Sequence, residues 1–592
     1  MNVAINVAMN LATKVAMNLA TKVAMNLATK VAMSIVKSFA VHGTENHTEK
    51  FTRTGVRNGS FVLFGLMGML LGANPANGQL VAPLPEPFYS LRQNSVSSME
   101  ARPEAVWTGP GLNRISDLDG SIFVPENADS LFSGRGRAFS MQVSGDIVFA
   151  GLGYSTVLNG SSVQTAQGYL LTRDNGESWD FFDFPLDPVP DDPEQCGGTS
   201  VGPPCDLEVQ YGGETYFRTR ITVPQQSPPF EVDFRDNTFL SVNWASGLLR
   251  SSDGGESWER LLLPPGSTTT MAPGQSLQWT SQTSSGETVN RYDPRYDNNL
   301  LGFGLMIDSS DRVWVGTAGG LNISENALDA PSGEIEWRHI RASSELRGLP
   351  GNWIVTIREE PETGIVWLTT WNASQNDYDR FALASTSDGG QTFQHYLTGE
   401  RINDIGFRNG RIYVAAESGL FVSDDRGNSW IRYGEIRSAN RVLGQNTSFY
   451  SVASTESAIW IGTSDGVAVS RDDGENWDIL RTDMPLAGGN VYQPDAPDVN
   501  AYAYPNPFAP RLHSNVRIRF EAMGPDARIQ IFDFGMNLVH SETMQLTGDP
   551  GAYEFSWDGS DPTRRLVSDG PYFYQIETGG EMIRGKILVI DG

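Results

Sequence analysis

One short motif recurs along the chain and constrains its fold more than any other feature. The consensus is Ser/Thr-x-Asp-x-Gly-x-x-Trp/Phe, and five copies fit it: TRDNGESW (172–179), SSDGGESW (251–258), TSDGGQTF (386–393), SDDRGNSW (423–430) and SRDDGENW (470–477). A sixth, degenerate copy is NISENALDAPSGEIEW (322–337). The Ser/Thr and Asp oxygens can accept nearby backbone N–H bonds, and Gly supplies the positive φ that other residues resist. Each copy therefore predicts a tight hairpin turn closed by its own side chains.

Strand-like segments precede several copies of the motif. RVWVGTAGGLNIS (312–324), RIYVAAESGLFVS (411–423) and AIWIGTSDGVAVS (458–470) each show apolar alternation, a small-residue turn and a second strand. With one earlier strand and one after the aromatic residue, each unit has four strands. The two shortest aromatic-to-aromatic intervals match a propeller blade of about 40–50 residues, and the longer ones predict insertions at 183–208 and 264–296. We expect an all-β chain with a six- to seven-bladed β-propeller.

These repeats resemble those of the Asp-box (BNR) β-propellers, over roughly residues 100–495. That superfamily includes sialidases, xyloglucan-cleaving glycosidases and photosystem II assembly factors, so the resemblance implies a fold much more than a function. In such propellers the box lies on the outer strands, away from the central channel. The resemblance therefore implies a structural role for the box aspartates, which are Asp174, Asp253, Asp388, Asp425 (or its neighbour Asp424) and Asp472.

The last 90 residues carry a different pattern. Alternating strand-like segments follow YPNPF (504–508), and WDG (557–559), GPYFY (570–574) and GKILVI (585–590) occur in order after it. The pattern resembles FlgD-type Ig-like domains and the C-terminal sorting domains of type IX secretion cargo. It implies a small Ig-like β-sandwich over 504–592 and a secretion machinery as partner. Arg564 stands where such domains commonly have Gly, and a plain Ig-like spacer remains the alternative.

The N-terminus reads as an export signal behind a repetitive extension. Residues 1–51 begin with four octapeptides and predict a disordered extension or an early start site, whereas 52–78 have the basic and apolar regions of a signal peptide cleaved before Gln79. No later run approaches 18 apolar residues, so we expect no transmembrane segment in the mature protein and a secreted or cell-surface location.

The remaining boundaries follow from composition. We expect a linker at 79–103, the propeller at 104–495 and a second linker at 496–503, where the Pro- and Asp-rich stretch predicts few crossing contacts, so that the C-terminal domain folds alone.

Charge and cysteine content exclude several classes of partner. A formal net charge of −27 and a pI of about 4.6 disfavour nucleic acid and anionic membranes. The only cysteines, Cys196 and Cys205, lie in one Gly/Pro-rich insertion and predict a disulfide in an exported protein. Six scattered histidines give no metal-ligand spacing, and no cofactor motif occurs, so we expect neither metal nor cofactor.

Catalysis is weakly supported by the sequence, which leaves the question of an enzyme open and leans against it. The nearest match to a sialidase arginine motif, YFRTRITVP (216–224), lacks the Ile-Pro that should follow its first Arg. Carboxylates that a glycosidase would need occur without any distinctive pattern, as Asp233, Asp236, Asp297 and Asp308.

Aromatic residues outside the boxes are better candidates for a ligand platform. The candidates are Trp244, Trp371, Tyr292 and Tyr296, with Trp279, Trp353 and Tyr378 as further aromatic residues outside the boxes. A binding or scaffold module that holds an extracellular glycan or protein leads, a secreted carbohydrate-active hydrolase is the alternative, and an assembly factor comes third.

Overall fold

The computed structural model describes residues 80–590 except for short gaps. Those gaps are 85–93, 119, 124, 126–136, 159, 193–195, 197–201, 283–285, 373–378, 446, 482–498, 512 and 514. The octapeptide repeats, the predicted signal peptide and Gln79 lie outside the described residues. The described part is almost entirely β, with two 3-10 turns, η2 (Asn298–Leu300) and η3 (Ser332–Glu334).

Seven antiparallel sheets of consecutive strands form the blades. Blade 1 has β1 (Ser98–Arg102), β2 (Ala105–Gly109), β3 (Asn113–Ser116) and β4 (Ile122–Phe123); blade 2 has β5 (Arg137–Ser144), β6 (Ile147–Leu158), β7 (Ser161–Thr172) and β8 (Asp180–Asp183); blade 3 has β11 (Pro229–Arg235), β12 (Thr238–Asn243), β13 (Gly247–Ser251) and β14 (Glu259–Leu261). Blade 4 has β18 (Gly302–Ile307), β19 (Val313–Thr317), β20 (Leu321–Ser324) and β21 (Trp337–Ile340), with β15 (Thr270–Met271) added at its outer edge.

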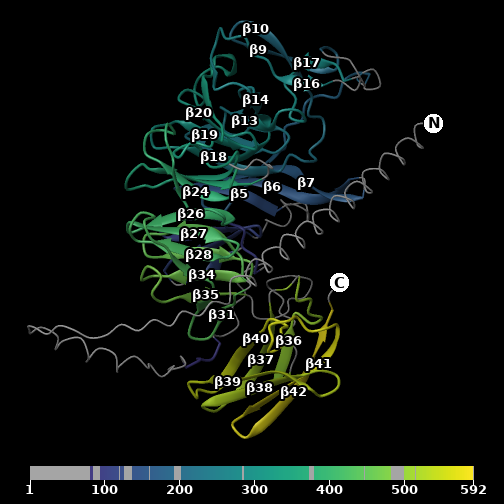
Figure 1. Cartoon of the computed structure of the whole chain (residues 1–592), viewed down its shortest axis with the longest axis vertical. Helices are drawn as coiled ribbons and strands as arrows, with labels where there is room; N and C mark the ends of the chain where they lie inside the picture. Colours follow the sequence, from purple (N-terminus) through teal and green to yellow (C-terminus); the bar gives the residue numbers. More distant parts are fainter. Residues whose placement is uncertain are drawn as a thin grey trace, which may run out of the picture. The chain divides into compact units, whose positions relative to one another are not determined.

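The other three blades have four strands each. Blade 5 has β22 (Trp353–Glu359), β23 (Val366–Trp371), β24 (Ala382–Thr386) and β25 (Gln394–Tyr396); blade 6 has β26 (Ile402–Arg408), β27 (Arg411–Ala416), β28 (Gly419–Ser423) and β29 (Ile431–Tyr433); blade 7 has β32 (Phe449–Ser454), β33 (Ile459–Thr463), β34 (Gly466–Ser470) and β35 (Asp478–Leu480). In Figure 1, strands β26 to β28 of blade 6 lie next to strands β34 and β35 of blade 7.

The seven first strands form a closed ring. Each of β1, β5, β11, β18, β22, β26 and β32 contacts the next, and β32 contacts β1. The backbone N–H of Val96 donates to Thr463 O at 2.9 Å, which ties the first blade to the seventh. The all-β propeller expectation is confirmed, and within the described residues the blade number is seven. Blade 1 begins at Ser98, inside the segment that we predicted to be a linker, because its first strand is too polar to be recognised by alternation.

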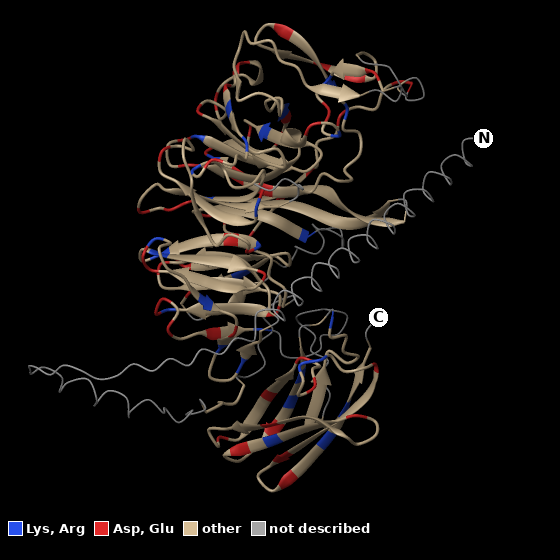
Figure 2. Ribbon diagram, viewed as in Figure 1, with Lys and Arg blue, Asp and Glu red and all other residues tan. Residues whose placement is uncertain are grey.

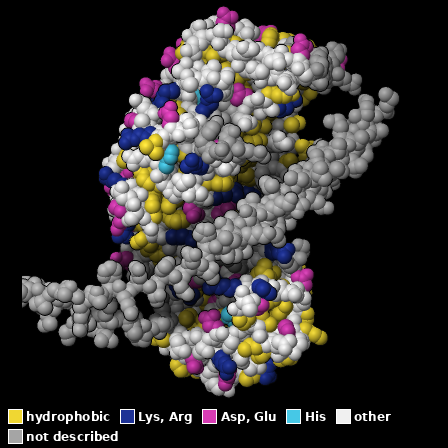
Figure 3. Space-filling model, in the orientation of Figure 1, with side chains coloured by type: hydrophobic (Ala, Val, Ile, Leu, Met, Phe, Trp, Pro, Cys, Tyr) yellow, Lys and Arg dark blue, Asp and Glu magenta, His cyan; other side chains and the backbone are white. Residues whose placement is uncertain are grey.

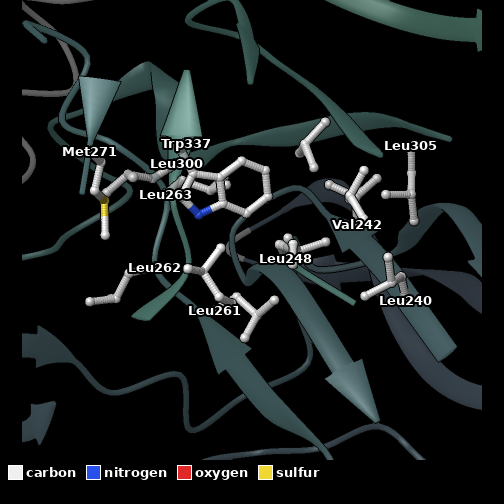
Figure 4. Packing of buried hydrophobic residues seen from close by; sticks show 14 of the residues in the cluster. Leu240, Val242, Leu248, Leu261, Leu262, Leu263, Met271, Leu300, Leu305 and Trp337 are labelled. Atoms are coloured by element: carbon white, nitrogen blue, oxygen red, sulfur yellow. The ribbon is translucent and has the colours of Figure 1, made fainter. Parts of the chain in front are cut away.

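Apolar side chains between neighbouring blades make the core. Figure 4 shows leucines of blade 3, such as Leu240 and Leu248, packed against Leu305 and Trp337 of blade 4. Burial of such side chains from water is the main stabilising term. Figure 2 shows acidic residues both in the turns of the propeller and on strands, and on the face seen in Figure 3 charged and apolar side chains are intermingled.

The insertions form small hairpins outside the blades. They are β9 (Asp206–Tyr211) with β10 (Glu214–Thr219), β16 (Thr280–Gln282) with β17 (Thr288–Asn290), and β30 (Ile436–Arg437) with β31 (Val442–Leu443). Ion pairs hold the first of these hairpins to blade 3. The Asp187 carboxylate accepts from Nη1 and Nη2 of Arg218 on β10, at 2.7 and 3.0 Å, and from Arg260 on β14 at 3.1 Å. Arg218, the first arginine of the FRTR string, is therefore committed to a structural ion pair.

The C-terminal part is a two-sheet β-sandwich. One sheet has the order β36 (Ala501–Tyr504), β37 (Val516–Ala522), β40 (Gly551–Trp557), and the other has β39 (Leu538–Gln545), β38 (Asp526–Phe532), β41 (Gly570–Thr578), β42 (Glu581–Val589), drawn in yellow-green to yellow in Figure 1. Its first strand begins at Ala501, inside the predicted second linker. Its core includes Phe520, Phe555, Trp557 and Tyr574.

Buried ion pairs link blade 7 to this sandwich. Arg481, which follows β35 and is 0% exposed, pairs with Glu554 on β40, and Asp465 pairs with Arg481 at 2.9 Å and with Arg517 on β37. The N-terminal segment adds backbone bonds: Val81 N–H donates to Gln545 O at 2.8 Å. These contacts join an Asp and an Arg at the ends of blade strands to opposite charges of the sandwich that lie far away in the sequence.

Candidate binding site at the channel mouth

The first strand of nearly every blade carries a β-bulge at the same level. The strand register shifts by one residue in blades 2 to 7, so that one extra residue on each inner strand stands opposite no partner. These extra residues are Phe139, Phe230, Phe303, Val355, Asn403 and Tyr450, and all six are half-buried. A bulge re-aims the side chain of its extra residue. Because these strands surround the channel, the bulge residues form a ring at its mouth.

Three of the bulge residues begin a continuous row of aromatic rings. The centroids of Phe139 and Phe230 are 6.5 Å apart, those of Phe230 and Phe303 5.4 Å, and those of Phe303 and Trp353 5.1 Å. Trp244 lies 4.8 Å from Phe303 and 5.7 Å from Trp353. We call these five residues the aromatic row. They come from four consecutive blades, and all are partly exposed.

Arginines stand at both ends of the row. Arg137, Trp353 and Arg401 each precede the bulge residue of their strand by two positions, which places them at one level. The Arg401 guanidinium lies 4.0 Å from the centroid of Trp371, which is the register partner of Trp353. Arg401 also pairs with Glu417 at 2.9 Å, but both side chains are exposed and the pair is weak.

A cavity of about 620 Å³ opens at the Phe139 end of the row. It is lined by Ser97, Pro110, Arg137, Ala138, Phe139, Tyr154, Ser155, Thr156 and Gln164. Its far wall is the extended part of the β6–β7 hairpin, whose strands have twelve residues each where the middle strands of blades 3 to 7 have four to six. Figure 1 shows β6 and β7 running on past their neighbours.

Below the mouth, one arginine is surrounded by carboxylates from three other blades. Arg358 on β22 lies 3.5 Å from Glu100 on β1, 3.5 Å from Glu231 on β11 and 3.4 Å from Asp404 on β26. The negative charge of Asp233, also on β11, acts on Glu100 as well. We call these five residues the channel cluster. It connects blades 1, 3, 5 and 6 across the channel.

The channel cluster shifts the ionisation of its own members. Burial raises the pKa of Glu100 to about 8, with Arg358 opposing and the other carboxylates adding to the rise. Burial raises the pKa of Glu231 to about 7 in the same way. Burial also raises the pKa values of Asp233 and Asp404, although each accepts a backbone N–H from the next blade, from Ile307 at 2.6 Å and Val452 at 3.0 Å respectively.

The predicted aromatic candidates divide between the mouth and the core. Trp244 belongs to the aromatic row and Trp371 lies beside it. Tyr292, by contrast, is 3% exposed and packs edge-on against Trp279. Because its ring is part of the core, Tyr292 is no longer a candidate for ligand binding. Tyr296 is exposed but lies beside Arg295, in the insertion. Tyr378 lies outside the described residues.

Most of the candidate carboxylates have local structural roles. Asp308 is fully buried and accepts from Trp314 Nε1 at 2.8 Å and Arg312 Nε at 2.7 Å. Asp297 accepts from the backbone N–H groups of Gly266 and Asn299, and Asp236 has a φ of 53° in a turn. Of the four candidates, the structure brings only Asp233 to the channel.

The five copies of the repeated motif, with the aspartates that we call box aspartates, close turns between the third and fourth strands of their blades. In all five, one aspartate oxygen accepts the box Ser/Thr hydroxyl and the backbone N–H four residues on, at 2.7–2.9 Å (Asp174, Asp253, Asp388, Asp425 and Asp472). The box glycines have φ from 82° to 101°. In the degenerate copy Asn326 takes the aspartate's place and accepts Glu336 N–H at 2.9 Å. Hydrogen bonds to the charged form hold the pKa of Asp174 at about 2.

Blade 1 carries a seventh turn of this kind that the sequence analysis did not find. Ser116, Gly120 and Phe123 keep the spacing of the box, but its Asp is displaced: Asp117 precedes the consensus position. Ser116 Oγ accepts Leu118 N–H at 3.3 Å. The Ser–Gly–Phe spacing alone would have found it.

The channel cluster was also missed from the sequence. In the sequence, the members of the cluster are marked by a charged residue close to the bulge of an inner strand. The charge directly follows the bulge residue in PFE (229–231) and IND (402–404), and Arg358 follows the bulge residue Val355 by three positions. A lone charge in an apolar strand is conspicuous, but only the ring closure shows that these charges meet.

The two cysteines are joined. A disulfide links Cys196 and Cys205, whose Cα atoms are 5.1 Å apart, within the insertion after blade 2. Within the described ranges, no set of three or more His, Cys, Asp or Glu residues is arranged to hold a metal ion. No helix in that part of the chain has the length and apolarity needed to span a membrane.

Comparison with known proteins gives structural neighbours only. No family model and no curated protein matches the sequence significantly. Among solved structures, the chain is similar to PorZ, a surface component of the type IX secretion system of Porphyromonas gingivalis (13% identity, TM-score 0.36), over 82% of this chain and 64% of that one.

Two further similarities are to YCF48 from Cyanidioschyzon merolae (15% identity, TM-score 0.36, 66% of this chain and 98% of that one) and to virginiamycin B lyase from Staphylococcus aureus (9% identity, TM-score 0.31, 64% and 94%). This chain thus spans less than two thirds of PorZ. None of these similarities assigns a ligand or an activity to the chain.

Proposed function

We propose that the protein is an exported β-propeller that binds an extracellular ligand on the aromatic row. The observation that carries this proposal is the row itself, because five adjoining rings from four blades are left partly exposed at the channel mouth. Partly exposed aromatic side chains that gather in one place mark interaction sites more often than packing defects.

Binding to the row can be measured through its own tryptophans. The full mature chain is titrated with soluble linear glycans and with peptides, and quenching of tryptophan emission is followed. Phe303→Ala combined with Trp353→Ala should abolish the binding that the wild type shows. Phe534→Ala, which removes an equally large ring that is 76% exposed on the sandwich, is the matched control and should bind as the wild type does. Equal binding by both variants would contradict the proposal.

A secreted carbohydrate-active hydrolase is the second candidate, and the channel cluster is the observation that favours it. A carboxyl with a pKa of about 7, like Glu231, or about 8, like Glu100, keeps a proton that a general acid could donate. Against this function, both carboxyls face the same guanidinium, that of Arg358. Release of reducing ends from a polysaccharide panel, lost in both Glu100→Gln and Glu231→Gln, would establish the hydrolase.

The C-terminal sandwich is proposed to direct sorting. Its motifs, YPNPF (504–508), WDG (557–559), GPYFY (570–574) and GKILVI (585–590), resemble those of type IX cargo. A chain that stops at residue 498 should accumulate in the periplasm, and residues 496–592 fused to a periplasmic reporter should carry it to the cell exterior. Normal export of the truncated chain together with a retained reporter would make the sandwich a spacer.

A further inference from the structure

The cavity beside Phe139 has a composition that differs from that of the row it adjoins. The row is purely aromatic, whereas the cavity combines one cation, two rings and several hydroxyl and amide groups. Arg137 is exposed in the cavity, and no ion pair to it occurs within the described part of the chain. An exposed cation at a pocket is notable in a chain whose formal net charge is −27.

From these observations we propose that the cavity binds one uronic acid unit of a linear acidic glycan whose neighbouring sugars lie on the aromatic row. The proposal rests on the binding function proposed above and names the class of ligand. Arg137 would pair with the sugar carboxylate through a charge-assisted, bidentate hydrogen bond. Phe139 and Tyr154 offer ring faces for the apolar side of the sugar.

Polar groups on the cavity wall match the hydroxyls of a sugar. Ser155 and Gln164 face each other across the β6–β7 hairpin, and Ser155 Oγ donates to Gln164 Oε1 at 3.3 Å. Together with the hydroxyls of Ser97 and Thr156 they offer both donors and acceptors at the cavity wall. The extended hairpin that supplies this wall is longer than the middle strands of the other blades.

The aromatic row continues from the cavity, so a linear polymer bound in the cavity can extend along it. Phe139 belongs to both the cavity and the row, so the two surfaces are continuous. Arg401 at the other end offers a second cation near Trp371. A polymer that carries a carboxylate on each sugar would meet a cation at both ends of the row and rings between them.

The test is calorimetric titration of the mature chain with oligogalacturonate. The neutral probe is cellohexaose, the sulfated probe is a dextran sulfate oligomer, and the peptide probe is a short poly-glutamate. We expect oligogalacturonate to bind most tightly and its affinity to fall as salt is added. Arg137→Gln should weaken this binding by about tenfold, the usual worth of one such pair. Arg528→Gln, an exposed arginine on the sandwich strand β38, is the matched control and should leave binding unchanged.

The outcomes separate the ligand class from the binding function. If cellohexaose binds as well as oligogalacturonate, or Arg137→Gln binds normally while the Phe303→Ala and Trp353→Ala pair does not, the aromatic row is a binding site and the uronate assignment is wrong. Stronger binding of poly-glutamate or of the sulfated oligomer also overturns the assignment. If no probe binds in any variant, both proposals fail. Thermal unfolding of each variant confirms that it is folded.

Discussion

Asp117 of blade 1 accepts a hydrogen bond from the Ser457 hydroxyl of blade 7 at 2.6 Å, which closes the ring of blades between residues 340 positions apart. The other Asp117 oxygen pairs with Arg471 at 2.9 Å, also on blade 7. Burial raises the pKa of Asp117, but hydrogen bonds from Ser457, Arg471 and Thr455 outweigh it and hold the pKa below its usual value. Every blade consists of consecutive strands, so contacts of this kind must hold the first and last blades together.

Asp117→Ala should therefore weaken the contact between blade 1 and blade 7. The change leaves Ser457 and Arg471 without their shared acceptor, which costs about 1–3 kcal/mol of unfolding free energy. Hydrogen exchange should rise in β1 to β4 and β32 to β35 before it rises elsewhere. Asp146→Ala, an exposed carboxylate that pairs with Arg102, is the control and should have little effect. A uniform rise in exchange across all blades would show that the contact between blades 1 and 7 does not unfold first.

The channel cluster should make stability fall as the pH rises. Glu100 keeps its proton up to about pH 8 in the folded chain but only to about 4.5 when unfolded, so the folded state binds more protons between these values. Its contribution is complete below pH 4.5 and is lost as the pH rises toward 8. The groups that face it are Arg358, Glu231, Asp404 and Asp233.

Glu100→Gln removes this titration, because glutamine stays neutral. Its thermal midpoint should match that of the wild type near pH 5 and exceed it near pH 8.5. The same scan with Glu417→Gln, an exposed carboxylate, should follow the wild type throughout. Parallel curves for Glu100→Gln and the wild type would mean that Glu100 is ionised in the folded protein at neutral pH.

The Asp boxes should show the opposite dependence on pH. Hydrogen bonds from Ser257 and Ser251 lower the pKa of Asp253 to about 2, so its contribution is present above the unfolded value and is lost as the pH falls from about 4 to 2. Asp253→Asn should lower the thermal midpoint at pH 7, by a few degrees at most because the turn is exposed, and the difference from the wild type should shrink near pH 2. Ligand binding at the aromatic row should be unaffected. A loss of binding would place the box closer to the site than its position between β13 and β14 allows.

The buried pairs between blade 7 and the sandwich predict joint unfolding. Glu554→Ala leaves Arg481 buried without one of its partners, and breaking a buried pair in this way costs about 3–5 kcal/mol. Calorimetry should show one transition for the wild type and two for the variant, because the sandwich no longer stabilises the propeller. Glu521→Ala changes an exposed glutamate on the neighbouring strand β37 and should keep a single transition. Two transitions in the wild type would contradict joint unfolding and support the expectation of an independent C-terminal domain.

The mature N-terminus is predicted at Gln79. The segment that follows it, Leu80–Leu84, bonds to Gln545, Thr547 and Ala552 of the sandwich and to Ala439. Mass spectrometry of the exported protein should find Gln79, or a residue close to it, at the N-terminus, and octapeptide repeats in the exported protein would contradict the prediction.

Local features of the chain were readable from the sequence because their causes are local. The Asp box needs only a hydroxyl, a carboxylate and a glycine at fixed spacing, so five copies and the degenerate one at Asn326 could be found directly. The copy at Ser116 escaped because its Asp is displaced. The sandwich strands were found by alternation, since one face is buried and the other is not.

The candidate site required the tertiary structure. Trp244 and Trp371 could be selected as aromatic residues outside the boxes, but Tyr292 has the same appearance in the sequence and lies in the core. Nothing local indicates that Phe139, Phe230 and Phe303 are the extra residues of bulges, because a bulge is defined by its partner strand. Glu100 and Arg358 are 258 positions apart and meet only when seven blades close into a ring.

The sequence by itself thus determined the repeating unit, the turn chemistry and the β-strand content, all of which follow from residues within one blade of each other. Tertiary structure alone decided the number of blades, the partners of the buried charges and the surface presented at the channel mouth. The physical reason is the range of the interactions: hydrogen bonds in turns and side-chain alternation act over a few residues, whereas burial, ion pairing and ring contact depend on which distant strands the closed propeller brings together.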